Sequence, residues 1–243
     1  MLQELLEGSF DKNTETFYTA IPGIILTIRD DLENLYIDVQ PVINDKKREG
    51  TATERPAVLN VPVQMPSSST AALTIPLNVG DPVLLIYSMR GLDVWKRGNG
   101  RPATPTDFRK FDKRDCFAIP GVWPISRSIN NPNKRLWEHD TRDVVLVNGI
   151  GTASECEVRL KPNGDVLIRT NQNISVECDN ADVLANSSAT ITTPELTVNA
   201  MSTTWVGDIN HTGNYTLTGG NATFNSIVFN THVHGGSPGP SNP

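Results

Sequence analysis

The sequence predicts an all-β protein, with a small barrel in its N-terminal part and a repetitive β shaft after it. The first observation is a series of short β-branched runs separated by Gly, Pro, Asn and Asp, with no convincing helical period. The second is a change of composition near residue 155, after which Thr, Asn, Ser, Ala and Val dominate and an aliphatic residue recurs every seven or eight positions. We therefore expect two β architectures in one chain.

The barrel is expected within residues 20–154, after an N-terminal extension of residues 1–19. Runs of this kind, separated by turn residues, are typical of a small closed barrel. Residues 96–136 are rich in Pro, Arg, Lys and Asn, so we expect a long excursion there that serves as a functional loop or an interaction arm. Six runs are the expected strands, at residues 23–28, 34–42, 57–63, 72–77, 82–88 and 143–149.

The shaft is expected over residues 155–210, followed by an apex at residues 211–243. Within each unit the side chains alternate, so that Ile174, Val176 and Cys178 share one face of an extended strand. Each unit then has one narrow apolar face that it cannot bury alone. The aliphatic beat falls at Ile168, Val176, Val183, Ile191, Val198 and Val206.

Two arrangements bury these faces. A solenoid of one chain needs about three strands per coil and leaves only two or three coils, which is marginal for a stacked repeat. Three chains wound around a common axis bury every inward residue against its symmetry mates, so a homotrimer is favoured. Roughly nine units, each adding about 4.8 Å, give a shaft of roughly 40 Å, longer than the roughly 30 Å hydrocarbon core of a bilayer.

The C-terminal segment NTHVHGGSPGPSNP indicates a metal site at the apex. His232 and His234 project to the same side of an extended strand, and three chains offer six imidazoles. Six nitrogen ligands favour an octahedral ion, so ferrous iron is preferred to zinc, and nickel or cobalt is chemically compatible. His139 and His211 have no such partner, and we expect each to be a surface or hydrogen-bonded histidine.

The His-x-His-Gly-Gly ending, the preceding repeat and the stretch NVGDPVLLIYSMRGLDVW together resemble the central spike proteins at the baseplate tip of contractile-tailed bacteriophages, of the small membrane-piercing class. The resemblance extends over nearly the whole chain, and its most specific part is the terminal motif. It implies an N-terminal oligosaccharide/oligonucleotide-binding (OB) barrel, an intertwined trimeric β-helix and one Fe²⁺ per trimer at the tip. Only His232 and His234 inherit a role from it, as metal ligands.

The resemblance also implies a function. The barrel end is expected to dock on the baseplate hub, and the metal-pinned end is expected to pierce the host outer membrane when the sheath contracts. A type VI secretion tip is a near neighbour of this interpretation. The alternative is a trimeric receptor-binding tail fibre or adhesin that recognises a surface glycan through loops. Its candidate aromatic residues are Trp205, Tyr215, Phe224 and Phe229, which fit equally well in a shaft core.

Other classes are not expected. The formal charge is −6, aromatic residues make up 6% of the chain and no Lys or Arg follows Arg169, so a nucleic-acid partner is not predicted. The acids and base of residues 139–143 have no nucleophile in a recognisable context, so no enzyme and no catalytic or cofactor-binding residue is predicted. Without a signal peptide or a long apolar run, the chain is expected to be made in the host cytoplasm, to stay soluble and to join the virion. Cys116, Cys156 and Cys178 are expected to be small buried residues.

Overall fold

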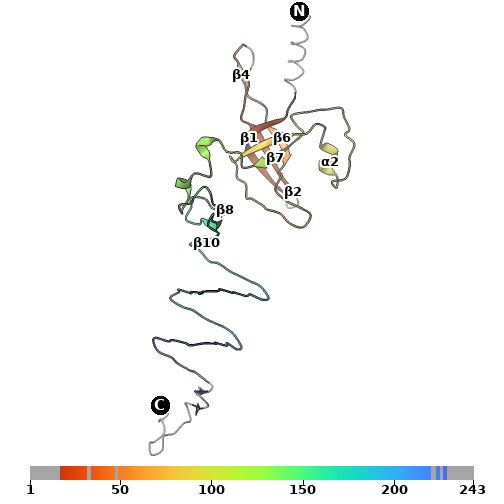
Figure 1. Ribbon diagram of the computed structural model, residues 1–243. Coiled ribbons are helices and arrows are strands. Elements are labelled where there is room, and N and C mark those ends of the chain that lie inside the picture. The colour runs from red at the N-terminus through yellow and green to blue at the C-terminus, as the bar shows by residue number, and fades with distance from the viewer. Residues whose placement is uncertain (1–16, 32–33, 47–48, 220–222, 225–226, 229–243) are drawn as a thin grey trace, which may run out of the picture. The chain divides into compact units, whose positions relative to one another are not determined.

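The computed structural model describes residues 17–31, 34–46, 49–219, 223–224 and 227–228 (Figure 1). Internal contacts divide the chain into two compact units, Met1–Glu177 and Cys178–Pro243. Most of the expected N-terminal extension and most of the expected apex lie outside the described residues. Among the described residues, no helix is both long and apolar enough to cross a membrane.

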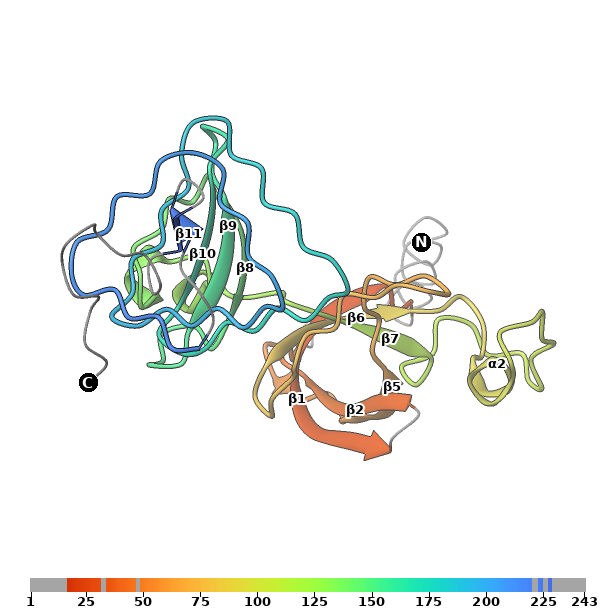
Figure 2. The same ribbon diagram turned by 90° about the horizontal axis from the view of Figure 1, so that it is seen from below.

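The first unit contains a five-stranded sheet whose strand order is β5-β2-β1-β6-β7, with every neighbouring pair antiparallel. The sheet curls into a half-barrel, and Figure 2 shows the strands arranged around a common axis. Its two outer strands approach each other where Val63 forms a parallel bridge with Ala118. The strands are β1 (Ala20–Asp31), β2 (Asn34–Pro41), β5 (Val58–Pro62), β6 (Pro82–Tyr87) and β7 (Cys116–Pro120).

The core of the half-barrel is made of β-branched and aliphatic side chains that alternate along these strands. Burying one such side chain stabilises the fold by about 1.5–3 kcal/mol. Gly23 on β1 faces this core, and a Cβ at this position would collide with Val39 of the paired strand. The most deeply buried core residues are Ile25, Ile37, Val39, Val61, Val83, Leu85, Cys116 and Ala118.

Four of the six predicted runs are strands of this sheet, and two differences have physical reasons. Residues 72–77 form no strand beyond a bridge at Ala72, because Pro76 inside the run has no backbone N–H to donate and only Leu77 packs against the core. The sequence prediction missed β7, which lies inside the expected 96–136 excursion. This strand has only five residues and follows a run of charged residues. Its Cys116 and Ala118 side chains nevertheless complete the core.

The sixth run is a strand, but it belongs to a second sheet. β8 (Val144–Asn148), β9 (Cys156–Leu160) and β10 (Val166–Thr170) form an antiparallel meander with the order β10-β9-β8. Gly164 adopts a positive φ in the turn between β9 and β10, a conformation that glycine tolerates best. The prediction that residues 143–149 belong to the barrel is therefore wrong.

The remaining elements are short. One helical turn, α2 (Asp93–Arg97), and two 3-10 turns, η1 (Ile125–Arg127) and η2 (Pro132–Lys134), lie in the irregular segments around β7. Two small ribbons pair β3 (Asp45–Lys46) with β4 (Ala52–Thr53) and β11 (Thr223–Phe224) with β12 (Ile227–Val228). The described part of the chain is thus nearly all-β.

Candidate assembly surface

One face of the three-stranded sheet is apolar and exposed. The strand register places Leu146 opposite Val158 and Val158 opposite Ile168, which gives one row of side chains across the sheet. A second row joins Val144, Leu160 and Val166 in the same way. These six side chains, here called the apolar face, are 36% to 67% exposed. A contiguous apolar patch of this kind marks an interaction surface.

The opposite face of the same sheet carries buried charges. Arg159 and Glu157 point away from the apolar face, and their side chains are at most 4% exposed. The guanidinium Nε lies 2.7 Å from Glu157 Oε1. The guanidinium also donates hydrogen bonds to the backbone carbonyl oxygens of Glu138 at 2.7 Å and Trp137 at 3.2 Å.

A second buried carboxylate, that of Glu155, binds the backbone of the segment that contains Trp137 and Glu138. Glu155 Oε2 accepts hydrogen bonds from the backbone N–H groups of Leu136 at 2.9 Å and Gly151 at 2.5 Å. Gly151 has a positive φ, and a Cβ there would collide with the carbonyl oxygen of Lys134. Residues 134–139 therefore cover the charged side of the sheet, and we call this arrangement of Glu155, Glu157 and Arg159 the charged clasp.

The sheet thus has the opposite polarity to an ordinary one. Charged side chains normally remain in water unless they are paired, and apolar side chains normally face a core. Here residues 134–139 cover the polar side, whereas the apolar side stays at least one-third exposed in the part of the chain that the structure describes. This exposed face is suited to contact another molecule.

The segment that follows, residues 171–219, has only local side-chain hydrogen bonds among the described residues. Residues 171–219 form no backbone–backbone hydrogen bond with any described residue and no strand. Figure 1 shows residues 178–219 running back and forth in long extended passes. The beat residues from Val176 to Val206 are 61% to 97% exposed. A long extended segment without backbone pairing and without buried apolar side chains gains little to offset the conformational entropy of ordering it, so pairing with further strands would stabilise it.

The predicted metal ligands, His232 and His234, lie outside the described residues. Within the described part of the chain, no group of three or more His, Cys, Asp or Glu side chains is arranged to hold a metal ion. His211 Nε2 lies 3.1 Å from the carbonyl oxygen of Asn214. His139 is buried, with Nε2 3.2 Å from Asn130 Oδ1. Both are hydrogen-bonded histidines, as the sequence predicted.

The cysteines divide into two classes. Cys116 is buried in the core of the half-barrel, and burial raises the pKa of its thiol to about 12. Cys156 and Cys178 are exposed in the single chain, so the prediction that they are buried is wrong for this chain alone. Cys156 lies between Asn148 and Thr170 on the same side of the sheet as the apolar face.

The apolar face was missed at the sequence level, although its signal is present. Residues 156–160 read CEVRL, in which apolar and charged residues alternate with the period of a strand. Such alternation normally predicts that the charged residues are the exposed ones. The structure reverses this expectation because the backbone of residues 134–139 hydrogen-bonds Glu155 and Arg159, and Arg159 in turn forms an ion pair with Glu157.

Comparison with known protein families matches residues 21–121 to the family described as "Phage protein Gp138 N-terminal domain". The match covers the half-barrel and less than half of the 243 residues. The comparison with curated proteins gives no match. The family match supports a phage structural protein.

Proposed function

We propose that this protein is a non-enzymatic homotrimeric spike at the tip of a phage tail baseplate, where it pierces the host outer membrane as the sheath contracts. The observation that carries the proposal is the exposed apolar face followed by residues 171–219, which form no backbone–backbone hydrogen bond with any described residue. A chain built in this way requires copies of itself. The match of residues 21–121 to a phage protein domain supports its place in a virion.

Threefold association would both bury the apolar face and pair the backbone of residues 171–219. Three copies of the apolar face around an axis would form a closed core, because each face would be covered by its two neighbours. Strands of residues 171–219 from three chains would then exchange the backbone hydrogen bonds that one chain leaves unmade. The result would be an intertwined β-helix, in which no sheet edge is left free to pair with other proteins.

The half-barrel would be the end that docks on the baseplate hub. Its strand order and the parallel approach of β5 and β7 are those of a five-stranded Greek-key barrel of the OB type, which supports the assignment. A small barrel is rigid, since its core residues are almost fully buried. It can therefore transmit an axial load from a hub to a shaft.

His232 and His234 would pin the other end. Imidazole is a good ligand for Fe²⁺, and two histidines from each of three chains provide the six ligands of an octahedral site. An ion bound by three chains would resist splaying of the chain ends under load, where separation of the trimer would otherwise start.

Sedimentation equilibrium of the full-length protein tests the proposal. The expected mass is three times that of the 26.6 kDa chain. Labelling of purified virions with an antibody against the half-barrel should then place the protein at the tail tip in electron micrographs. A stable monomer with ordered C-terminal strands would overturn the proposal.

A receptor-binding fibre or adhesin is the second candidate, because Trp205 and Tyr215 are exposed in the single chain. Aromatic side chains on the outside of a trimeric shaft would suit sugar rings. The same residues would be buried if they line the shaft core. Glycan-array binding by the trimer, abolished by Trp205→Ala, would favour the fibre, whereas the spike predicts no glycan binding.

A further inference from the structure

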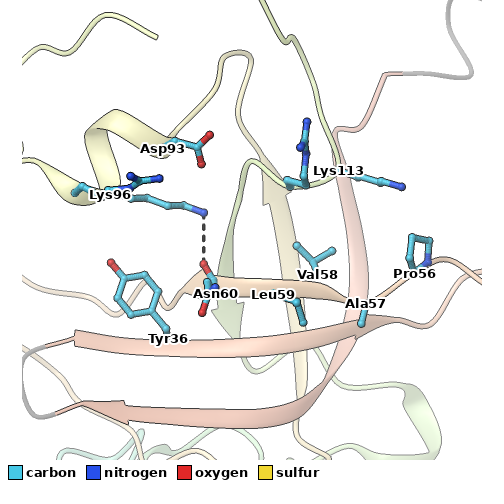
Figure 3. A pocket seen from close by; sticks show the side chains of 11 residues that line it. Tyr36, Pro56, Ala57, Val58, Leu59, Asn60, Asp93, Lys96 and Lys113 are labelled. Atoms are coloured by element: carbon cyan, nitrogen blue, oxygen red, sulfur yellow. Dashed lines mark hydrogen bonds between the residues drawn. The ribbon is translucent and has the colours of Figure 1, made fainter. Parts of the chain in front are cut away.

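A groove of about 670 Å³ runs beside β5, the outer strand of the half-barrel (Figure 3). Five consecutive residues, 56–60, line it. Since side chains alternate along a strand, a groove over one face would be lined by every second residue. Here Pro56 and Ala57 precede β5, so the groove lies beside the start of this outer strand. The other lining residues are Tyr36, Asp93, Lys96, Arg97, Lys113 and Arg114.

A bulge shapes this edge. Two residues of β5, Leu59 and Asn60, lie opposite the single residue Asp38 of β2. Asn60 has a φ of 54°, and its N–H donates to Asp38 Oδ1 at 2.9 Å. Asp38 is in turn held by Arg29, whose Nη2 lies 2.8 Å from Asp38 Oδ2. Bulges of this type are common beside binding sites, because they re-aim a side chain, and here Leu59 is 57% exposed.

The groove is positively charged. Arg97 and Lys113 form no ion pair with another described residue, and Lys96 reaches across to the carbonyl oxygen of Asn60 at 3.5 Å (Figure 3). Arg114 is paired with Asp112 at 2.9 Å. Four cations therefore surround the groove of a chain whose formal charge is −6.

Among the described residues that line the groove, Asp93 is the single acid, against four cations. Asp93 is paired with Arg109, which holds the pKa of Asp93 below its usual range. Arg109 also contacts Asp107 at 2.8 Å and the buried Asp115 at 3.5 Å. Asp115 Oδ1 accepts a hydrogen bond of 2.9 Å from the backbone N–H of Leu92, the residue that precedes α2. This network fixes α2 beside the groove and leaves the groove with a net positive charge.

We propose that the β5 groove binds an extended acidic peptide segment of a partner protein, which adds as a strand along the edge of β5. Strand addition uses main-chain hydrogen bonds for affinity and side chains for specificity, so Asp and Glu on the incoming strand would face Lys96, Arg97 and Lys113. A single-stranded nucleic acid fits less well, because it requires successive aromatic platforms and the groove has Tyr36 alone. The inference rests on the proposed docking of the half-barrel to a partner and names the chemistry of that contact.

The first test measures binding of a fluorescein-labelled decapeptide of alternating Glu and Thr to the full-length protein by fluorescence anisotropy. The double variant Lys96→Glu/Lys113→Glu should weaken binding by about tenfold or more. The matched control Lys46→Glu/Lys161→Glu makes the same change of charge at sites outside the groove, and should weaken binding less than about twofold. Equal loss in both variants would show that only the net charge matters, and would overturn the proposal.

Hydrogen exchange distinguishes strand addition from a loose electrostatic contact. Bound peptide should slow amide exchange within residues 56–60 and leave residues 156–160 unchanged. No protection, or tighter binding of a dT20 oligonucleotide than of the peptide, would contradict the inference. Sedimentation of the same samples distinguishes the two proposals. A protein that remains trimeric but does not bind the peptide would refute peptide binding in the groove and not the trimeric spike.

Discussion

Leu146 and Val158 lie directly opposite each other on β8 and β9, and they are 62% and 36% exposed, although Glu157 and Arg159 beside them are buried. In the proposed trimer, neighbouring chains would cover this apolar pair. Each buried aliphatic side chain contributes about 1.5–3 kcal/mol, so six such side chains per chain are a substantial driving force for association.

Leu146→Asp should prevent trimer formation. A carboxylate in the centre of the apolar face would be buried without a partner in each of three subunits, and this cost exceeds what the interface regains. Sedimentation velocity should show the mass of a single chain in place of the trimer. Val79→Asp is the matched control, because Val79 is 66% exposed on the half-barrel, away from the apolar face. A trimeric Leu146→Asp protein would show that the sheet is not part of the interface.

Thiol labelling should report the same interface. Cys116 should not react with maleimide at pH 8, because its thiol is buried and burial raises its pKa to about 12. Cys156 is exposed in the single chain but lies beside the apolar face, so it should be protected in the trimer. Leu146→Asp should make Cys156 reactive, as mass spectrometry of labelled peptides would show. Rapid labelling of Cys156 in the wild-type trimer would contradict this arrangement.

The sequence predicted the half-barrel well, because the strands 20–31, 34–41, 58–62 and 82–87 are marked by local β-branched composition and by flanking turn residues. β7 could not be predicted in the same way. Its residues Cys116–Pro120 follow a charged run, and they become a strand only because β6 offers an open edge. Tertiary pairing, not local propensity, decides such a strand.

The apolar face shows a second limit of prediction. Alternation in residues 156–160 predicts which side chains share a face but not which face is covered. That choice depends on the carbonyl groups of Trp137 and Glu138, which solvate Arg159 from about 20 residues away in sequence. The repeat after residue 170 predicted the need for partner chains from the same type of pattern, and the proposed trimer rests on both.

Removal of one member of the charged clasp should be strongly destabilising. Arg159→Met leaves the buried carboxylate of Glu157 without its cation, which costs about 3–5 kcal/mol. Chemical unfolding at constant protein concentration would measure the loss. The double variant Arg159→Met/Glu157→Leu removes this pair and should recover part of the loss, because the buried Asp143, 3.9 Å from Arg159 Nη1, still loses its cation. If the double variant is as unstable as the sum of the two single variants, the two side chains do not act as a pair.

Asp38→Asn should make the half-barrel less stable at neutral pH but not in acid. The hydrogen bonds from Arg29 lower the pKa of Asp38, so the charged form stabilises the folded state above the unfolded pKa of about 3.9. This contribution is lost as the pH falls through the folded-state pKa. Because Arg29 is about half exposed, we expect a Tm difference of only about 5 °C near pH 7.

The two proteins should therefore converge as the pH is lowered below about 4. Thermal unfolding of both proteins across this range measures the gap directly. Asp182→Asn is the control, since Asp182 is exposed and outside the half-barrel, and its Tm should equal that of the wild type at every pH. A Tm difference that increases in acid would mean that the charged form of Asp38 destabilises the folded state.

The double variant His232→Ala/His234→Ala should lose the bound transition metal but remain trimeric, because the contacts of the apolar face and the shaft are unchanged. Elemental analysis of the purified wild type should find one iron per three chains, and His211→Ala should retain it. Metal retention should fall below about pH 6, because ligating imidazoles must be neutral and the free imidazole pKa is about 6.5. The metal-free trimer should then separate at lower force in single-molecule pulling from the C-terminal end, since the chain ends have lost their common ligand. Wild-type trimers without any transition metal would refute the proposed metal site at the tip. The Leu146→Asp variant would still test the trimer interface.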